Sequence, residues 1–165
     1  MRRIDQAFVV VVLLSAVLGG VTFFNFQDSL RTSDRIPDIS QRVDIEVTHF
    51  RLGEESAQVK VRVSNPTRFN LTIQSAFFRM YAQNNAQLAY GSGIRKDNRS
   101  ISLAPGESTL ITYDIMLSPN QMDQLRSALN SGGFTLTGRQ TLVYNEAQFT
   151  SRINEVRITE TGEVS

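Results

Sequence analysis

The feature that most constrains this chain is an uncharged, strongly apolar run close to its N-terminus. No Asp, Glu, Lys or Arg occurs from Ala7 to Phe24, and Asn25 and Phe26 extend the run by two uncharged residues. A helix rises about 1.5 Å per residue, so this run spans about 27–30 Å, the thickness of the hydrocarbon core of a bilayer. The sequence therefore predicts a transmembrane helix at residues 7–26.

The flanking charges predict the orientation of this helix. Arg2 and Arg3 lie in the short segment 1–6, whereas Asp28 follows the apolar run. Lys and Arg are retained on the cytoplasmic side of membranes. We therefore expect a single-pass protein of the cell membrane with a cytoplasmic tail at residues 1–6 and all later residues on the extracytoplasmic side.

A cleaved signal peptide is the alternative interpretation, and it would release a secreted domain. The apolar run is longer than the usual hydrophobic region of such peptides, which has about 7–15 residues. A cut after Gly20 would also place Leu18 at a position that requires a small residue. These features favour an uncleaved signal anchor.

The polar stretch at residues 27–42 contains Pro37 and shows neither helical nor strand periodicity. It is predicted to be a linker, and the alternative is an irregular segment packed along the domain. The rest of the chain is too short for two ordinary domains. We expect one domain at residues 43–160 and a short tail at residues 161–165.

Alternation of apolar and polar residues with a period of two dominates this domain, which is typical of strands with one buried face. The third strand carries apolar residues on both faces, so we expect it at a central position in the sheet. One face has Leu71, Ile73, Phe77 and Tyr81, and the other has Phe78 and Met80. The predicted strands lie around residues 43–49, 57–64, 71–81, 87–94, 109–117, 134–144 and 149–158.

One helix is expected between the last strands. Ser118 is a suitable N-cap, Pro119 suits the first helical position, and Gln121 completes a capping box. Met122, Leu125 and Leu129 follow at helical spacing before Gly132 and Gly133. About seven short strands and one helix predict an all-β fold, an antiparallel β-sandwich with the helix covering an edge or an open end.

The sequence offers few groups for chemistry. It has no cysteine and a single histidine, His49, which alternates with the apolar residues of the first strand and is expected in the core or at its rim. Glu54 and Glu55 sit in a turn and are expected to be solvated. Because no second histidine for a zinc site and no phosphate-binding loop accompany these residues, we expect no enzymatic activity, no metal and no cofactor.

Charge and sequons bear on partners and modification. Lys and Arg number 17 against 16 for Asp and Glu, so the chain lacks the excess of positive charge that nucleic-acid binding requires. Asn70 and Asn98 lie in Asn-x-Ser/Thr sequons, which would permit glycosylation of an exported surface.

The segment 59–71 is the most distinctive motif, because an alternating valine strand ends in Asn65-Pro66 and a short apolar stretch follows. Proline cannot donate to a strand ladder and biases the preceding residue toward extended geometry, so the strand ends there. This motif resembles the signature of the type 2 late embryogenesis abundant (LEA-2) proteins, also called the water stress and hypersensitive response (WHy) domain. The resemblance extends over about 115 residues, 44–158. It includes a strand that contains Gly91 and Gly93, the Pro-Gly turn at residues 103–108 and the closing helix.

The resemblance implies a β-sandwich related to fibronectin type III and immunoglobulin domains, with no catalytic residues. Plant members are linked to desiccation stress, and many carry one N-terminal membrane span with the domain outside the cytoplasm. Some membrane-anchored relatives have been proposed to carry lipid between their sheets.

Three functions are consistent with these features. The leading hypothesis is a non-enzymatic surface module that binds a protein or cell-envelope material. The second is lipid binding or transfer in an apolar cleft, although the residues that would line the cleft would more simply fill the core. These residues are Phe69, Phe77, Phe78, Met80 and Phe134. The third is stress protection of nearby membrane or protein.

Overall fold

The computed structural model describes residues 34–95 and 100–159. The predicted cytoplasmic tail, transmembrane helix and C-terminal tail lie outside the described residues, as does Asn98. In the part of the chain that is described, no helix combines the length and apolar character needed to cross a bilayer. The chain divides into two compact units, Met1–Pro37 and Asp38–Ser165, and the strands in the described ranges all belong to the second.

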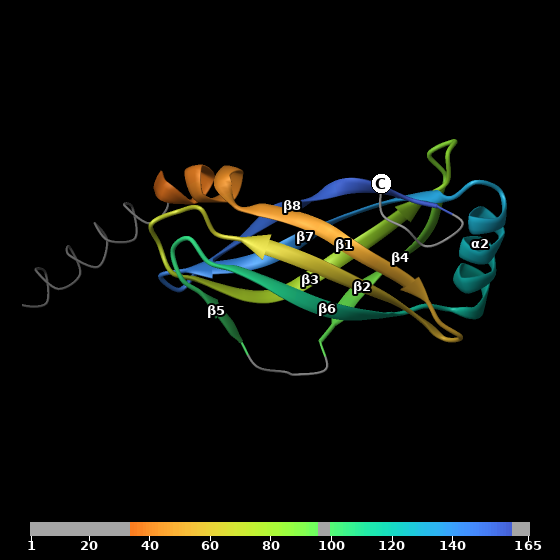
Figure 1. The fold of residues 1–165 in the computed structure, drawn as a ribbon, viewed down its shortest axis with the longest axis horizontal. Coiled ribbons are helices and arrows are strands. Elements are labelled where there is room, and N and C mark those ends of the chain that lie inside the picture. Colours follow the sequence, from red (N-terminus) through yellow and green to blue (C-terminus); the bar gives the residue numbers. More distant parts are fainter. Residues whose placement is uncertain (1–33, 96–99, 160–165) are drawn as a thin grey trace, which may run out of the picture. The chain divides into compact units, whose positions relative to one another are not determined.

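The predicted all-β antiparallel class and the helix near the C-terminus are confirmed, and most strand bounds agree to within three residues (Figure 1). Three residues that precede the Pro-Gly turn form an additional short strand, β5, which raises the number of described strands to eight. The strands are β1 (Asp44–Leu52), β2 (Ser56–Ser64), β3 (Leu71–Tyr81), β4 (Gln87–Ile94), β5 (Ile101–Leu103), β6 (Ser108–Met116), β7 (Phe134–Tyr144) and β8 (Ala147–Ile158).

Hydrogen bonds join all eight strands into one antiparallel sheet, whereas the sequence predicted two separate sheets. The order is β1-β2-β6-β4-β3-β7-β8, with β5 paired to β3, so β3 has the expected central position. The sheet curls until its end strands, β1 and β8, run beside one another (Figure 1). It is therefore nearly closed on itself around the core.

The junction between the two halves of the sheet is the short β4–β6 pairing, which contains only Gly93 opposite Ile115 and Ile94 opposite Asp114. Glycine is required here because a Cβ on Gly93 would lie 2.8 Å from ring atoms of both Phe78 and Tyr113. Strand β4 can therefore pass from β3 to β6 directly over these two rings.

The core is filled by the inward faces of all the long strands. Phe50 and Phe134 meet edge to face at 5.2 Å between ring centroids, and Phe78 meets Tyr113 in the same way at 5.6 Å. Such pairs add to the stability gained from burying the rings. The largest fully buried side chains also include Ile45, Met80, Ile115 and Leu125.

A β-bulge in β1 makes the prediction for His49 wrong. Val47 pairs with Val61 and His49 pairs with the next residue, Lys60, so Thr48 is an extra residue without a partner. The extra residue inverts the order of inward and outward side chains in the rest of the strand. His49 is consequently exposed, and Phe50 takes the inward position with 2% exposure.

A second irregularity, in β3, has the same effect on the predicted faces of that strand. The register against β7 shifts between Ile73 and Ala76. Before the shift, Ile73 points inward, and after it the inward residues are Ala76 and Phe78. Phe77, which the sequence placed with Leu71 and Ile73, therefore lies on the outer face.

The helix α2 (Pro119–Asn130) begins as predicted. The Ser118 hydroxyl accepts a hydrogen bond from the Gln121 amide, and the Gln121 side chain accepts one from the Ser118 amide, which is the expected capping box. The helix buries Met122, Leu125 and Ala128.

The structure differs from the predicted linker, because residues 34–42 are helical. Within the second unit, Ile39 is fully buried, and Ser40 binds β8 by donating its hydroxyl to Thr150 O at 3.0 Å. Ser151 donates its own hydroxyl to Ser40 O at 2.9 Å. Ile39 is the one buried residue of this short helix, which gives too little periodicity for the helix to be recognised in sequence.

Candidate functional site

The outer face of β3, β7 and β8 carries a half-open groove of about 610 Å³. Three strands contribute to it, together with Ser40 from the helical segment that precedes β1. The other lining residues are Phe77, Arg79, Thr137, Gly138, Arg139, Thr150, Ser151 and Arg152. The groove therefore contains three guanidinium groups, and none of its lining residues is acidic.

Strand register brings the three arginines together. Arg139 on β7 is directly opposite Arg152 on β8, and on its other side Arg139 is opposite Phe77 on β3. Arg79 lies two residues farther along β3, opposite Thr137. Residues separated by two on a strand share a face, so these side chains emerge on the same side of the sheet.

The arginines differ in their partners. Arg152 forms an ion pair with Glu155 at 3.6 Å, and both side chains are largely exposed, at 73% and 60%. The guanidinium carbon of Arg79 lies 5.5 Å from the centre of the Phe77 ring, in cation–π geometry. Neither Arg79 nor Arg139 has an ion pair or side-chain hydrogen bond with the residues in 34–95 and 100–159.

The hydroxyl groups of the groove are mostly engaged with the backbone. Ser40 and Ser151 donate to the main chain, as described above, and Thr137 Oγ1 donates to Ile153 O at 3.5 Å. The guanidinium groups are thus the main donors that remain available to a ligand.

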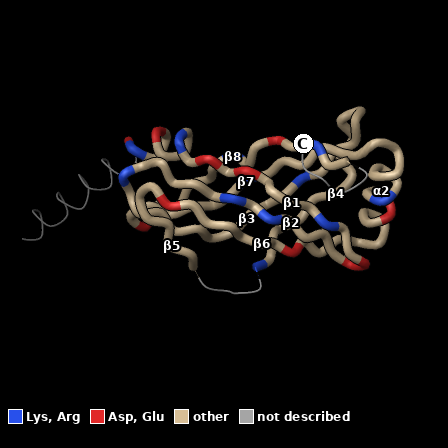
Figure 2. Tube along the Cα trace, viewed as in Figure 1, with Lys and Arg blue, Asp and Glu red and all other residues tan. Residues whose placement is uncertain are grey.

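A second hollow of about 320 Å³ continues from the first along the strands. It shares Thr137 and Arg152 with the groove and extends past Thr135 and Glu155 to Asn85 in the β3–β4 turn. The two hollows together make an elongated recess. Elsewhere on the strands Lys and Arg are interspersed with Asp and Glu (Figure 2).

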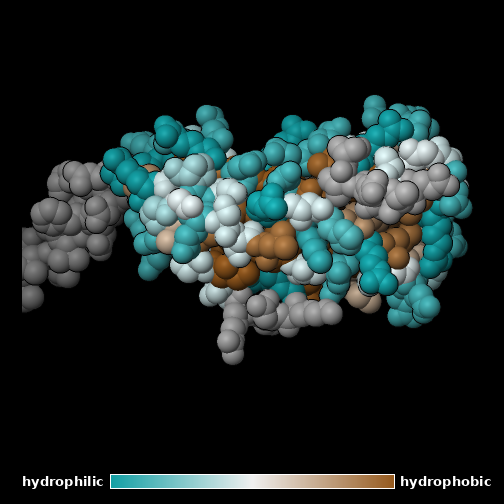
Figure 3. Space-filling model, in the orientation of Figure 1, coloured by the Kyte–Doolittle hydropathy of each residue, from teal (hydrophilic) through white to brown (hydrophobic). Residues whose placement is uncertain are grey.

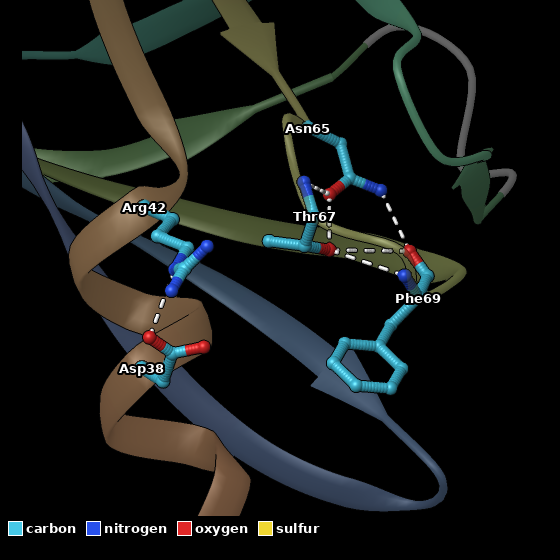
Figure 4. A network of polar contacts seen from close by, with 5 residues as sticks. All are labelled: Asp38, Arg42, Asn65, Thr67 and Phe69. Atoms are coloured by element: carbon cyan, nitrogen blue, oxygen red, sulfur yellow. Dashed lines mark hydrogen bonds and ion pairs between the residues drawn. The ribbon is translucent and has the colours of Figure 1, made fainter.

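The Asn65-Pro66 motif forms a buried structural network rather than part of this recess (Figure 4). The Asn65 side chain is 1% exposed, and its amide nitrogen donates to the carbonyls of Phe69, Leu103 and Ala104 at 2.7, 3.1 and 3.1 Å. Its oxygen accepts from the amide and hydroxyl of Thr67 at 3.2 and 2.6 Å. Asn65 therefore joins the loop after β2 to the Pro-Gly turn before β6.

The five aromatic and apolar residues predicted to line a lipid cleft lie in three different places. Phe78, Met80 and Phe134 are buried in the core at 0–1% exposure. Phe77 lies on the outer face, in the groove, with its ring centroid 6.3 Å from that of Tyr90. Phe69 is at the loop end of the sheet and packs on Tyr144 with ring centroids 4.9 Å apart.

The other predicted residues are distributed over the surface. Asn70, in the first sequon, is exposed immediately before β3. Glu54 and Glu55 are exposed in the β1–β2 turn. In the described ranges no three His, Asp or Glu residues are grouped as a metal would require.

Hydrophobic residues on the visible face form small groups between hydrophilic ones (Figure 3). The large exposed ones are Tyr90, Ile94, Leu110 and Met116, each 53–60% exposed. Scattered apolar residues of this kind are common on folded proteins.

The patterns of the individual strands do not reveal the arginine groove. Each arginine occupies an outward position of its own strand, which is ordinary for a solvated face. Only the register between β3, β7 and β8 makes them neighbours, and single-strand patterns carry no register between distant strands.

A scan against protein-family models finds no match, and no curated protein matches the chain in sequence. Among solved structures, Northeast Structural Genomics Consortium target SoR45 is similar with a TM-score of 0.50 and 12% identity, over 73% of this chain and 87% of that one. A protein from Archaeoglobus fulgidus has a TM-score of 0.48 and 10% identity over 71% and 96% of the two chains. A putative late embryogenesis abundant protein has a TM-score of 0.38 and 11% identity over 78% and 86%. The SoR45 likeness concerns the fold alone, and the two weaker likenesses carry no argument about family or function.

Proposed function

We propose that this chain is a non-enzymatic binding module, held at the cell membrane by residues 7–26, with its β-domain on the extracytoplasmic side. It acts by binding a protein or cell-envelope partner next to the membrane. The uncharged N-terminal run and the preceding Arg2 and Arg3 support the anchor and its orientation. Stress protection is a role that the resemblance to LEA-2 domains would imply.

The observation that carries this proposal is the elongated recess on β3, β7 and β8. Its size, about 610 Å³ for the main groove, suits a ligand larger than a single ion. Strand positions are rigid, so the backbone points from which the lining side chains extend are fixed before a partner arrives, which lowers the entropic cost of binding. A binding surface on a rigid scaffold is what a module without reactive groups requires.

Co-sedimentation tests the proposal directly. The full-length protein, in neutral detergent, is mixed with the insoluble envelope fraction of the source cells, and the pellet is assayed for the protein. We expect saturable recovery in the pellet that excess unlabelled protein displaces. Protein that stays in the supernatant at every concentration contradicts the proposal.

Protease treatment of intact cells tests the orientation. We expect external protease to remove the segment that contains Asn65 while residues 1–6 stay protected. Protection of the β-domain in intact cells would contradict the proposed topology. Native mass spectrometry of the same purified protein reveals any tightly retained lipid, which would instead support the lipid-binding hypothesis.

A further inference from the structure

We propose that the groove on β3, β7 and β8 recognises an acidic glycan, a sugar chain that carries carboxylate or phosphate groups. This inference rests on the proposed function and specifies the chemistry of the envelope partner. It assigns Arg79, Arg139 and Arg152 as the residues that bind the anionic groups.

The pairing of Arg139 with Arg152 is the first reason. Side chains directly opposite each other on antiparallel strands have Cβ atoms about 4.5–5.5 Å apart, and like charges at such positions destabilise the sheet. Glu155 balances only one of the two arginines, through an exposed and long ion pair. An arrangement that costs the folded state stability is explained if the arginines serve an anionic ligand.

The chemistry of the guanidinium group is the second reason. Arg presents a planar set of donors that matches two oxygens of a carboxylate or phosphate at once. Arg79 is diagonal to Arg139 across the β3–β7 pair, and diagonal neighbours lie about 7–8 Å apart, with their Cβ atoms somewhat closer. The three groups thus form a short row that can hold more than one anionic substituent.

The remaining surface of the recess suits sugar rings. Phe77 lines the groove, and Tyr90, which lies outside its lining, packs against the Phe77 ring with centroids 6.3 Å apart and is 53% exposed. Aromatic faces of this kind pack against the C–H faces of sugars, while Thr135, Thr137 and Asn85 lie along the second hollow where sugar hydroxyls can reach them. The continuity of the two hollows favours an extended ligand over a single small anion.

The same features argue against a flat membrane surface as the ligand. A bilayer presents its charges in a plane, but these arginines border a recess. A membrane-binding face also needs exposed apolar residues that insert beside the basic ones. Tyr90 is exposed near the groove, whereas Ile94 lies at the end of β4 that pairs with β6, and Leu110 and Met116 belong to β6 itself.

Fluorescence anisotropy with labelled oligogalacturonate tests the inference, with neutral maltooligosaccharide of equal length as the comparison ligand. The full-length protein in neutral detergent is expected to bind the acidic chain at least tenfold more tightly, with an affinity that falls as salt rises. The double variant Arg139→Gln/Arg152→Gln should lose at least tenfold in affinity. A phosphorylated mannan fragment and anionic phospholipid vesicles serve as further probes.

A matched control separates the groove from total charge. Arg51→Gln/Arg62→Gln removes two exposed positive charges from β1 and β2 and should leave the affinity unchanged. The groove variant should unfold at the same or a higher urea concentration than the parent, because it removes the repulsion between opposite arginines. A lower midpoint would show that the arginines serve the fold and would overturn the inference.

Other outcomes also decide the question. Absence of binding to both acidic glycans, equal affinity for the neutral chain, or full affinity in the groove variant each overturns the inference. Arginine-dependent binding that is tighter to vesicles than to glycans would assign the groove to the membrane surface instead. If the groove variant still co-sediments with the envelope fraction, the proposed function stands while this inference fails.

Discussion

At the residue scale, one buried amide determines how two loops meet. Asn65 donates to three carbonyls and accepts two hydrogen bonds from Thr67, so its side chain is fully used. Its main chain also takes part, because Asn65 N donates to Glu107 O and Gly106 N donates to Asn65 O. No other residue type of this size supplies both donors and acceptors in this geometry.

Replacing Asn65 with Ala should lower the free energy of unfolding by about 3 kcal/mol, since buried groups left without partners cost about 1–3 kcal/mol each. Asn65→Asp should be at least as harmful because it places a carboxylate beside three carbonyl oxygens. Urea denaturation followed by circular dichroism measures both. The exposed neighbour provides the control, and Asn70→Ala should change stability by less than about 0.5 kcal/mol. Equal effects at the two positions would refute the assigned role of Asn65.

Tyr113 is a buried residue whose pKa is shifted by its surroundings. It is fully buried and donates its hydroxyl to Gln140 Oε1 at 2.9 Å, while the Gln140 amide donates to Ser75 O at 2.8 Å. Burial raises the pKa of the Tyr113 phenol above its ordinary value near 10. The folded state therefore holds this proton more tightly than the unfolded state does.

The sign of the pH dependence follows from this shift. The stability contributed by Tyr113 is complete below about pH 10 and is lost as pH rises through the raised pKa of the folded state. Tyr113→Phe should cost about 1 kcal/mol at pH 7, where Gln140 loses a partner. As pH rises from 9 to 11, the free energy of unfolding should fall more in the parent than in the variant. Urea titrations at each pH measure the free energy of unfolding of both proteins. An equal decrease in the two proteins would contradict this prediction.

At the element scale, β4 determines how the two halves of the sheet connect. Its inner residues include Gly91 and Gly93, and a Cβ on Gly91 would lie 2.6 Å from Ile115 Cγ2. The Gly-containing strand noted in the sequence is therefore the strand that crosses between halves. The two glycines allow the crossing because they leave room for side chains of β3 and β6.

Gly93→Ala should destabilise the protein by about 2–3 kcal/mol, because the added methyl group overpacks against the Phe78 and Tyr113 rings. Gly106→Ala is the control, since no atom lies within 4 Å of its added Cβ and only its positive φ of 77° is strained. That strain should cost about 1–2 kcal/mol. Thermal and urea unfolding measure both variants. A Gly93 variant more stable than the Gly106 variant would show that β3 and β6 can move apart freely at this junction.

At the scale of the whole molecule, the closure of the sheet depends on a segment that belongs to no strand. Strands β1 and β8 have no shared ladder, but Asn154 Nδ2 donates to Asp44 Oδ1 at 3.1 Å, and Ser40 exchanges hydrogen bonds with β8. Ile39 is fully buried between these contacts. Residues 38–42 thus cover the gap where a closed barrel would have its last strand pairing.

Ile39→Ala should lower the free energy of unfolding by about 2–4 kcal/mol, as expected for truncating a fully buried isoleucine. Arg42→Ala, in the same helical segment, removes an ion pair with Asp38 whose side chains are 62% and 59% exposed. Such an exposed pair contributes about 0–1 kcal/mol. Hydrogen exchange should show faster opening of β1 and β8 in the Ile39 variant only. Unchanged protection of both strands would mean that residues 38–42 do not close the sheet.

The strands and the helix were predictable because their determinants are local. Alternation defines a strand wherever one face is buried, and the Ser118 capping box defines the start of α2. The predictions for His49 and Phe77 failed because a bulge inserts one residue and inverts every later side chain. Nothing in the sequence of β1 or β3 alone marks the bulge, since it depends on the partner strand.

The sequence by itself determined the antiparallel β class, the positions of most elements and the Asn65-Pro66 strand end. Only the tertiary structure decided that the strands form one curled sheet, that residues 38–42 join β8, and that Arg79, Arg139 and Arg152 share a groove. Periodicity reports which residues of one strand face water, and this follows from backbone geometry within a few residues. Which strands are neighbours, and in what register, is set by packing between segments up to about a hundred residues apart.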